Sequence, residues 1–514
     1  MSSQQHPAFA PGAGRSSPPA PGAGADTTRG RQAGWGLATS LGLLLAVIGP
    51  IVFSRPTLDS FMHAPVVLAF AITLYAAARL WLLLMAGSNR PISLTFWLFV
   101  YVFFGLAALA NVVTQQFPLL GQTFAERTEI DALLTIVVGL AGYEVGRLAA
   151  QSRRVQERWT HRLNRPTVRI RRVTVIGLVG IITVTYFTVK YGLGTRFSSR
   201  DTATETFFGP GQRHVSSFLR QDKASGLLRI ALDWIPIFVA LYLLLCNWQV
   251  RRAHARAAGG VARWGLRRYT LLVALAVGVL LADNPFSGPR ARFLGVAIAL
   301  LLAVWPLVTP RRFRIFVAIL VVGQLFVYPS ADVFRNQKRV LHTASLSTQF
   351  RTNPSFGMFQ QEVNAQVYVR DKGHTWGRQL VGVALGWVPR KYWSGKPKTT
   401  GELVFPAANQ TIPTSLSIWG WAFVEGGMPW VFIVLAAYGW AAGLLESAYR
   451  RRPRDRASFA AVAAPLFAAF QTLVIRGELQ TAVADLAPVA LLVIVACGLR
   501  SRARHRSSGP SAAG

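Results

Sequence analysis

The chain of 514 residues is short of the residue types on which several classes of protein depend. It contains two cysteines, Cys246 and Cys497, and both lie inside apolar runs, which excludes an ectodomain built on disulfide bonds. It has 21 acidic residues against 55 lysines and arginines. No HExxH motif, CxxC motif or cluster of His and Asp occurs in the sequence, and we therefore expect no metal site.

Hydrophobic residues, by contrast, make up 52% of the chain, and the mean hydropathy is +0.35. Apolar runs recur along the whole length, and about 20 such residues in a row span a bilayer. The sequence therefore predicts an all-α polytopic membrane protein with about 12 transmembrane helices. The expected spans are 35–53, 64–86, 92–114, 129–150, 173–191, 226–247, 269–283, 293–309, 315–331, 428–447, 457–476 and 480–498.

Basic residues give the chain a formal net charge of +34, a value typical of nucleic-acid-binding proteins. Here, however, they gather in short loops between apolar runs, which is the pattern that sets membrane topology. Eight arginines lie in 151–172, six in 248–268 and four after Leu499. Alternating spans place all of these on one side, so we expect a multi-pass plasma-membrane protein with both termini in the cytoplasm and no nucleic-acid partner.

The ends of the chain differ in composition from its middle. Residues 1–34 are rich in Pro, Gly, Ala and Ser, and they predict a disordered cytoplasmic tail. A transmembrane domain is expected over 35–498, followed by a basic cytoplasmic tail at 499–514. Two long loops, 192–225 and 332–427, face the opposite side, and the second has eleven basic and five acidic residues. A positive outward-facing surface favours a negatively charged ligand.

Residues 386–402, GWVPRKYWSGKPKTTGE, stand out in the second long loop. Arg390 and Lys396 each adjoin a proline, which restricts the backbone beside them. Arginine's planar fork binds phosphate oxygens in pairs and stays charged. Trp393 is suited to anchor at the lipid interface or to stack on a sugar ring. Other arginines recur on the same side of the membrane: Arg290 in NPFSGPR, Arg335 in ADVFR, and Arg378.

Together these pieces resemble the O-antigen polymerase family, the Wzy-type oligosaccharide repeat-unit polymerases. The matching residues are Asn284-Pro285 with Pro289-Arg290, Ala331-Asp332-Val333-Phe334-Arg335, Trp387-Val388-Pro389-Arg390 with Trp393, Lys396-Pro397 and Thr400-Gly401, and Ser415-Leu416-Ser417 before Glu425-Gly426-Gly427. In the other long loop, Arg200 and Gly211 bracket ten residues, which is similar to an Arg-x10-Gly pattern of such polymerases. One departure is the run 419–424 before Glu425, where the family pattern has a small residue.

The resemblance implies a membrane glycosyltransferase that polymerises polyprenyl-diphosphate-linked repeat units into a cell-envelope polysaccharide, with no cofactor. Donor and acceptor are then both lipid-linked glycans in the bilayer, and a flippase and a chain-length regulator are expected partners. Because negative charge builds on the lipid diphosphate as it leaves, nearby cations would stabilise it. The expected substrate-binding residues are Arg290, Arg335, Arg378, Arg390, Lys396, Trp393 and Arg200. Glu425 and His374 rank first as the base that takes the acceptor proton, ahead of Glu402 and Asp332.

Other interpretations stay open on sequence alone. An O-antigen-ligase-like transferase uses the same kind of donor with a different acceptor. A transporter or flippase predicts internal repeats, and none is evident. A glycosyltransferase that uses a lipid-phosphate sugar predicts an acidic pair in the first outer loop, where Asp59 stands alone. Among charges within the spans, Asp233 is expected to pair with Arg229 one turn away, whereas Asp485 has no partner nearby in the sequence.

Overall fold

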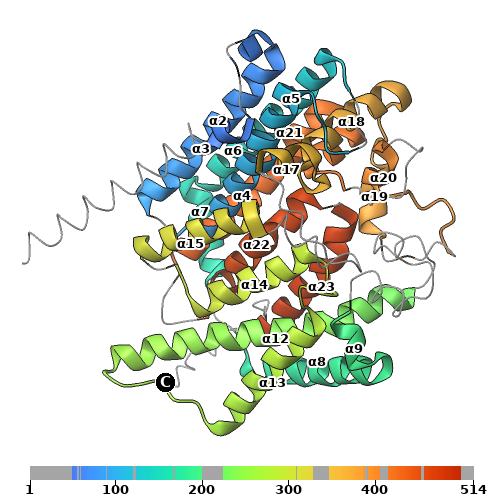
Figure 1. Ribbon diagram of the computed structural model, residues 1–514. Coiled ribbons are helices and arrows are strands. Elements are labelled where there is room, and N and C mark those ends of the chain that lie inside the picture. The colour runs from blue at the N-terminus through green and yellow to red at the C-terminus, as the bar shows by residue number, and fades with distance from the viewer. Residues whose placement is uncertain are drawn as a thin grey trace, which may run out of the picture.

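The computed structural model describes residues 49–54, 57, 59–87, 89–119, 123–165, 168–198, 224–307, 309–327, 346–386, 388, 392–405, 415–452, 457–477 and 479–498. The two tails and most of the first expected span lie outside these residues. Where it is described, the chain is helical and has no β-strand, which confirms the predicted all-α fold class (Figure 1).

The helices pack around two hydrophobic cores. The first core joins α3 (Ala64–Ala86), α4 (Pro91–Phe99), η3 (Val100–Leu106), α5 (Ala107–Thr114), α6 (Glu126–Ala150), α15 (Pro310–Val322), α18 (Met358–Lys372) and α21 (Ile418–Arg450). The second joins α8 (Ile170–Tyr191), α12 (Ala224–Ala257), α13 (Leu266–Ala282), α14 (Arg290–Val304) and α23 (Leu479–Cys497). Helix α22 (Phe459–Arg476) contributes to both cores and so links them. In Figure 1, α8, α12 and α13 lie together at the bottom, below α22 and α21.

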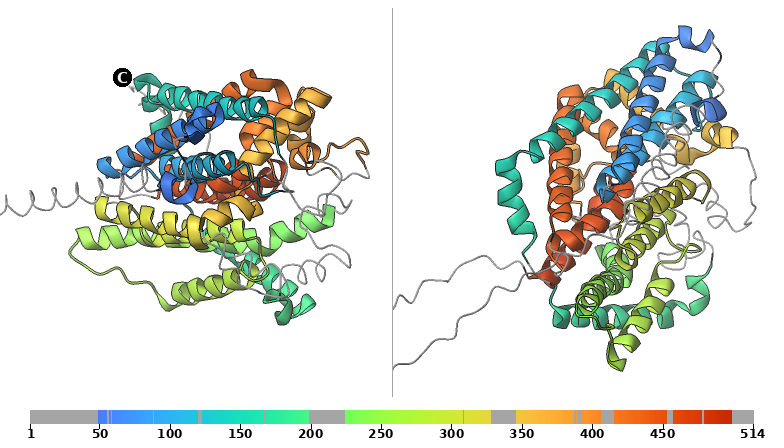
Figure 2. Two further views of the ribbon diagram at one scale, coloured as in Figure 1. Left: turned by 45° about the horizontal axis from the view of Figure 1, so that its top comes forward. Right: turned by 90° about the vertical axis from the view of Figure 1, so that its left-hand side faces the viewer.

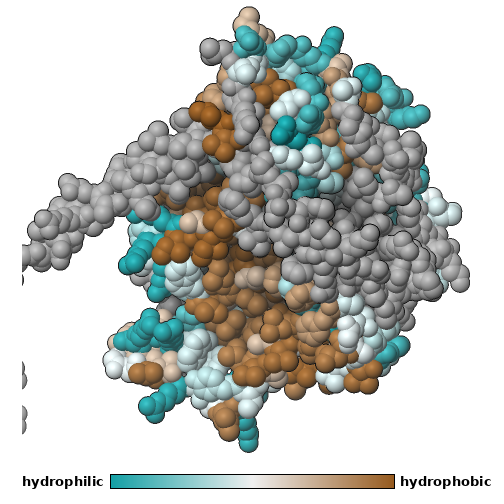
Figure 3. All heavy atoms as spheres, viewed as in Figure 1, coloured by the Kyte–Doolittle hydropathy of each residue, from teal (hydrophilic) through white to brown (hydrophobic). Residues whose placement is uncertain are grey.

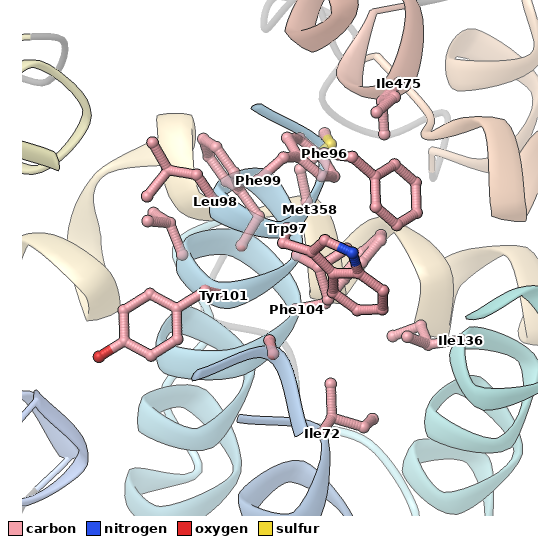
Figure 4. Close-up of a cluster of buried hydrophobic side chains, with 14 of the residues drawn as sticks. Ile72, Phe96, Trp97, Leu98, Phe99, Tyr101, Phe104, Ile136, Met358 and Ile475 are labelled. Atoms are coloured by element: carbon pink, nitrogen blue, oxygen red, sulfur yellow. The ribbon is translucent and has the colours of Figure 1, made fainter. Parts of the chain in front are cut away.

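A continuous helix formed by α4, η3 and α5 runs through the middle of the first core. Every residue from 91 to 112 is buried, which is possible because almost all of them are apolar. Figure 4 shows Ile72, Ile136 and Met358, from three other helices, around Phe96 and Phe104 of this helix. Its middle part, η3, is π-helical, and π-helical turns recur at functional sites.

Eight helices in the described part of the chain are long and apolar enough to cross a membrane, consistent with a multi-pass membrane protein. They cover Ala64–Ala86, Pro91–Thr114, Glu126–Ala150, Ile170–Tyr191, Leu232–Ala257, Ile418–Arg450, Phe459–Arg476 and Leu479–Cys497. Three further expected spans fall on the shorter helices α13, α14 and α15, which have 17, 15 and 13 residues. A π-helical segment, η4 (Gly323–Val327), extends α15.

Many hydrogen bonds between distant segments lie near the ends of the helices, and these fall into two groups. One group joins Ser93 to Glu446, Asn164 to Ala448, Arg169 to Ala496, and Gln249 to Val304. The other joins Asn111 to Phe350, Leu119 to Gln360, Asn284 to Arg196, and Arg476 to Ser355. Successive helix ends along the chain therefore lie alternately at one end of the molecule and at the other, as expected for helices that cross a membrane in opposite directions. We name the first the basic end, which holds the arginine-rich helix α7 (Arg153–Leu163), and the second the site end, which holds the described residues of 346–405.

The outer surface of the helices is apolar. On α8, Val175, Ile182 and Val189 are 60%, 67% and 79% exposed, and they recur along one face. Figure 3 shows apolar residues in brown over the lower part of the molecule, where α12, α13 and α14 lie in Figure 1. A surface of this kind is stable against lipid and unfavourable against water.

Glycines bring α6 and α21 into backbone contact. A Cβ atom on Gly146 would lie 1.8 Å from the carbonyl oxygen of Ala436, and one on Gly142 would lie 2.5 Å from that of Phe432. In the opposite direction, a Cβ atom on Gly439 would lie 2.2 Å from the carbonyl oxygen of Tyr143. Such close approach is typical of helices packed inside a membrane.

Candidate functional site

The second long loop, 332–427, contains several short helices among its described residues. Its described residues form α17 (Leu346–Thr352), η6 (Pro354–Phe356), α18, α19 (Arg378–Ala384) and α20 (Thr400–Val404). In the left view of Figure 2 the long helices run across the picture, and this light-orange segment gathers at their right-hand end. Helix α18 packs on α6 and α21, so the loop rests directly on the transmembrane helices.

Helix α21 is interrupted at the site end. Gly426 (φ −168°, ψ 28°) and Gly427 (φ 73°, ψ −163°) break the helical path, and Pro429 follows. The positive φ of Gly427 is a conformation that glycine adopts readily. Glu425 is therefore the last residue of the helical segment before the break. A short first segment, from Ile418 to Glu425, therefore ends with carbonyl groups that have no partner within the helix.

Residues 374–376 dock on those carbonyl groups. His374 Nδ1 lies 3.1 Å from the carbonyl oxygen of Phe423. The backbone N–H groups of Thr375 and Trp376 donate to the carbonyls of Val424 and Glu425, both at 2.9 Å. Since a carbonyl only accepts, Nδ1 must carry a proton, and in the neutral imidazole Nε2 of His374 is then the acceptor nitrogen. The loop thus fixes both the position and the tautomer of this histidine.

The carboxylate of Glu425 caps the start of α19. One oxygen accepts from the backbone N–H of Leu380 at 2.8 Å, and the other accepts from Gly377. Glu425 itself is buried, with 2% exposure. A buried carboxylate at a helix N-terminus is stabilised both by these donors and by the helix dipole.

Lys396 occupies the other end of α19. Its ammonium group donates to the carbonyl oxygens of Gly386 at 2.7 Å and Val388 at 3.0 Å, and its side chain is buried. The negative charge of Glu425 therefore lies at the N-terminus of α19, and the positive charge of Lys396 lies near its C-terminus. This is the arrangement that the helix dipole favours. The described contacts of Lys396 are with the protein backbone, whereas the sequence predicted a role in substrate binding.

Arg378 and Trp393 complete the predicted residues near α19. Arg378 is the first residue of α19 and is exposed, so its guanidinium group reaches solvent from a capped helix start. Trp393 is half-buried, and its carbonyl accepts from the backbone N–H of Lys396 at 3.1 Å. Arg200, Arg335 and Arg390, with Gly211, lie outside the described residues.

Trp376 is a site residue that the sequence did not single out. Its φ is 47°, a left-handed conformation that a residue with a large side chain seldom adopts. Its side chain is 73% exposed and packs edge-on beside His374, with ring centroids 5.4 Å apart. Residues with strained backbone conformations cluster at functional sites. The glycines on either side, in the sequence KGHTWGR, are the signal that could have indicated a sharp loop here.

Arg290 meets a second arginine at the site end. Its Nη2 donates to the hydroxyl of Ser355 at 2.8 Å, while Nη2 of Arg476 donates to the carbonyl oxygen of Ser355 at 3.0 Å. Arg290 starts α14 and Arg476 ends α22. The sequence did not single out Arg476 as a site residue.

The turn that carries Arg290 is held by Asn284. The Asn284 side chain accepts from the backbone N–H groups of Phe286 and Ser287, and it donates to the carbonyl oxygen of Arg196 at 2.7 Å. Arg196 also binds Asp233 through two hydrogen bonds of 2.6 and 2.8 Å. The partner of Asp233 therefore comes from another helix and was not predicted, while the side chain of Arg229 lies outside the described residues.

A buried acid lies behind the site. Glu362 on α18 is 1% exposed and accepts a hydrogen bond from the hydroxyl of Ser417, the N-cap residue of α21. Burial raises the pKa of Glu362 to about 8, although the Ser417 hydrogen bond acts in the opposite direction. In the described part of the chain, no three His, Cys, Asp or Glu side chains come together in a way that could hold a metal ion.

No protein-family model matches this chain, and no curated protein or solved structure matches it either. The fold defines the class as an all-helical protein with several membrane-length helices.

Proposed function

We propose that the protein is a membrane glycosyltransferase that polymerises polyprenyl-diphosphate-linked oligosaccharide units on the outer face of the plasma membrane. The observation that carries this proposal is the docking of His374 on the interrupted helix α21, directly beside Glu425. His374 and Glu425, the two residues ranked first as the base from the sequence, therefore lie next to each other. Arg290, Arg378 and Lys396 belong to the same end of the helices.

The charge distribution supports the proposed orientation. The basic end holds the arginine-rich segments 151–172 and 248–268, and segments of this kind stay in the cytoplasm. The site end then faces outward, where finished envelope glycans are needed. A lipid-linked substrate would reach it from the surrounding bilayer, along the apolar outer surface of the helices.

In the proposed reaction, a hydroxyl oxygen of the acceptor sugar attacks the anomeric carbon of the donor glycan. The bond between that carbon and the diphosphate oxygen breaks, and the electron pair leaves with the lipid diphosphate. The hydroxyl proton passes to Nε2 of His374. The Phe423 carbonyl supports this role because it holds Nδ1 as the protonated nitrogen. Arginine side chains at the site end stabilise the leaving diphosphate.

Two neighbouring residues take different parts in this scheme. Glu425 is a positioning residue, since both of its oxygens accept backbone hydrogen bonds from the start of α19. Trp376 offers an exposed aromatic face next to His374, and sugar rings bind well against such faces. Together they orient the acceptor hydroxyl relative to the base.

The test is complementation of a deletion strain with the wild-type chain or His374→Asn, at equal membrane levels. The readout is the length ladder of envelope polysaccharide. We expect long chains with wild type and single repeat units with the variant. An unchanged ladder in the deletion strain would refute the proposal. Full-length polymer that stays on its lipid carrier would indicate a ligase instead, and lipid-linked units trapped on the cytoplasmic face would indicate a flippase.

A further inference from the structure

Charged side chains gather at the basic end, where α3, α4, α6 and α21 pack together. Arg79 on α3 lies 2.5 Å from one carboxylate oxygen of Glu144 on α6. Arg147, about one turn further along α6, donates to the other oxygen from Nε and Nη2 at 2.9 and 2.5 Å. All three side chains belong to membrane-length helices, where charged groups are costly and usually serve a function.

Arg90, the residue before α4, belongs to the same region. The charge of Glu446 on α21 acts on it. Both carboxylate oxygens of Glu446, however, accept from Ser93, one from its backbone N–H at 2.8 Å and the other from its hydroxyl. Among the described residues, nothing accepts a hydrogen bond from Nε of Arg90, although that atom is buried. Burial, and next the charge of Arg450, lower the pKa of Arg90. A buried donor without an acceptor is unfavourable, so an acceptor from outside the chain would stabilise Arg90.

Positive charge exceeds negative charge in this region. The groups that interact electrostatically here, which we call the arginine cluster, are Arg79, Arg90, Arg147, Arg450, Glu144 and Glu446. Four arginines and two glutamates give the cluster a net charge of +2. Like charges that are partly shielded from water repel each other strongly, and an anion between them removes this cost. The arginine cluster therefore favours a negatively charged ligand.

The arginine cluster borders the apolar outer surface of the helices. Leu82, three residues after Arg79, is 53% exposed, and Leu148, four residues after Glu144, is 57% exposed. Residues three or four apart share a helix face, so exposed apolar and charged side chains adjoin on both helices. The guanidinium carbon of Arg79 lies 5.2 Å from the ring centroid of Trp97, which holds this group against the helices. A ligand with an anionic head and apolar chains matches such a surface.

We propose that the arginine cluster binds the phosphate group of an anionic phospholipid from the membrane leaflet at the basic end. The fork of an arginine pairs with two phosphate oxygens, and basic pockets between transmembrane helices bind anionic headgroups. The acyl chains then lie along Leu82 and Leu148. A zwitterionic phospholipid carries an amine that the arginines repel, so the net charge selects an anionic one. The site lies at the opposite end of the helices from His374, and the inference goes beyond the function proposed above.

The test titrates phosphatidylglycerol into the full-length protein in neutral detergent and counts the bound lipids by native mass spectrometry. Wild type is compared with Arg90→Gln, Arg79→Gln and the control Arg153→Gln. Arg153 lies on α7 at the same end, pairs with Glu157 and has a side chain that is 93% exposed. The control therefore removes the same charge from the same end. We expect at least about a tenfold loss of affinity in the two cluster variants and no loss in the control.

Thermal unfolding without added lipid checks that each variant folds. Arg79→Gln leaves Glu144 paired with Arg147, so it remains a test where Arg90→Gln is unstable. Equal affinity for phosphatidylcholine would overturn the inference, because the acyl chains alone would then account for binding. Equally effective displacement by inorganic phosphate would overturn the lipid as the ligand.

Unchanged affinity in both cluster variants, or an equal loss in Arg153→Gln, would overturn the arginine cluster as the site. The polysaccharide ladder of the deletion strain tests the polymerase proposal separately, so each proposal can fail without the other.

Discussion

The carboxylate of Glu425 lies 2.8 Å from the backbone nitrogen of Leu380, and this contact ties the interrupted helix α21 to the start of α19. The backbone N–H of Trp376 also donates to the backbone carbonyl of Glu425, at 2.9 Å. Each of the two helix ends supplies what the other lacks, since a C-terminus has spare carbonyls and an N-terminus has spare N–H groups. A helix of only seven residues is thereby held in a fixed place.

Replacing Glu425 by Ala should release α19. The N–H groups of Gly377 and Leu380 would lose their acceptor, which costs about 1–3 kcal/mol where the groups are buried. We expect faster hydrogen exchange over residues 377–384, with the transmembrane helices unchanged. Glu425→Gln keeps one acceptor oxygen and should have a smaller effect. If exchange is unchanged while polymerisation is lost, Glu425 acts on the substrate itself and is not a positioning residue.

Replacing His374 by Asn should remove the base and keep the fold. The Asn amide still donates to the carbonyl of Phe423, but it does not accept the hydroxyl proton. Polymerisation should fall by about 10²–10⁴-fold, the usual contribution of a general base. His374→Ala should regain part of the activity when imidazole is added. His254→Asn, at an exposed position of the basic end, is the control. Full activity of His374→Asn would exclude the proposed role.

Much of the fold could be predicted from hydropathy. The expected spans 64–86 and 457–476 coincide with α3 and α22 to within a few residues, because an apolar run of this length has one stable form in lipid. The break in α21 was visible in Gly426, Gly427 and Pro429. The lengths of α13 and α14 were harder to predict from the sequence, because turns and packing, rather than hydropathy, set where these helices begin and end.

The site was predictable as a set of residue types, but not as a set of contacts. Lys396 and Arg290 look alike in sequence, yet one reaches two backbone carbonyls and the other a serine hydroxyl. Such partners depend on the path of the backbone, which no local pattern encodes. Arg476 was not predicted as a site residue, because in the sequence it stands at the end of an apolar run. Asp233 binds Arg196, which lies on another helix, and no local spacing in the sequence indicates that contact.

Lys396→Met should destabilise the loop around α19. Met has a similar length and fills the buried space, but the carbonyls of Gly386 and Val388 lose a charged donor. We expect a loss of about 1–3 kcal/mol, seen as a lower thermal unfolding temperature in detergent. Lys398→Met, an exposed neighbour, is the matched control. Unchanged stability together with weaker binding of the lipid-linked donor would instead support the role in substrate binding that the sequence suggested.

Gly146→Val should separate α6 from α21. The first added carbon would already lie 1.8 Å from the Ala436 oxygen and 2.9 Å from its Cα atom, and backbone atoms cannot rotate away. Overpacking of this kind costs about 1–3 kcal/mol or more. The measurement is the thermal unfolding temperature in detergent. Gly194→Ala, where no atom lies within 4 Å of the added carbon, should leave that temperature unchanged. Similar stability of wild type and Gly146→Val would contradict the close helix contact.

Glu362 should make stability depend on pH. Burial raises its pKa to about 8 from an ordinary value of 4.5. Between these values the folded protein keeps a proton that the unfolded chain has lost, so the free energy of unfolding falls as pH rises. The slope approaches about 1.4 kcal/mol per pH unit and vanishes above the folded pKa. Below the unfolded pKa both states are protonated, and Glu362 then contributes no pH dependence.

Glu362→Gln tests this directly, because Gln imitates the protonated acid and still accepts from the Ser417 hydroxyl. The difference in unfolding temperature between the variant and wild type should grow in favour of the variant from about pH 5 to about pH 8. Glu157→Gln, on the exposed side of α7, should show no such trend. Parallel curves for wild type and Glu362→Gln would mean that Glu362 is ionised in the folded protein. The contact between Ser417 and Glu362 would then hold a carboxylate at the start of α21, where the helix dipole favours negative charge.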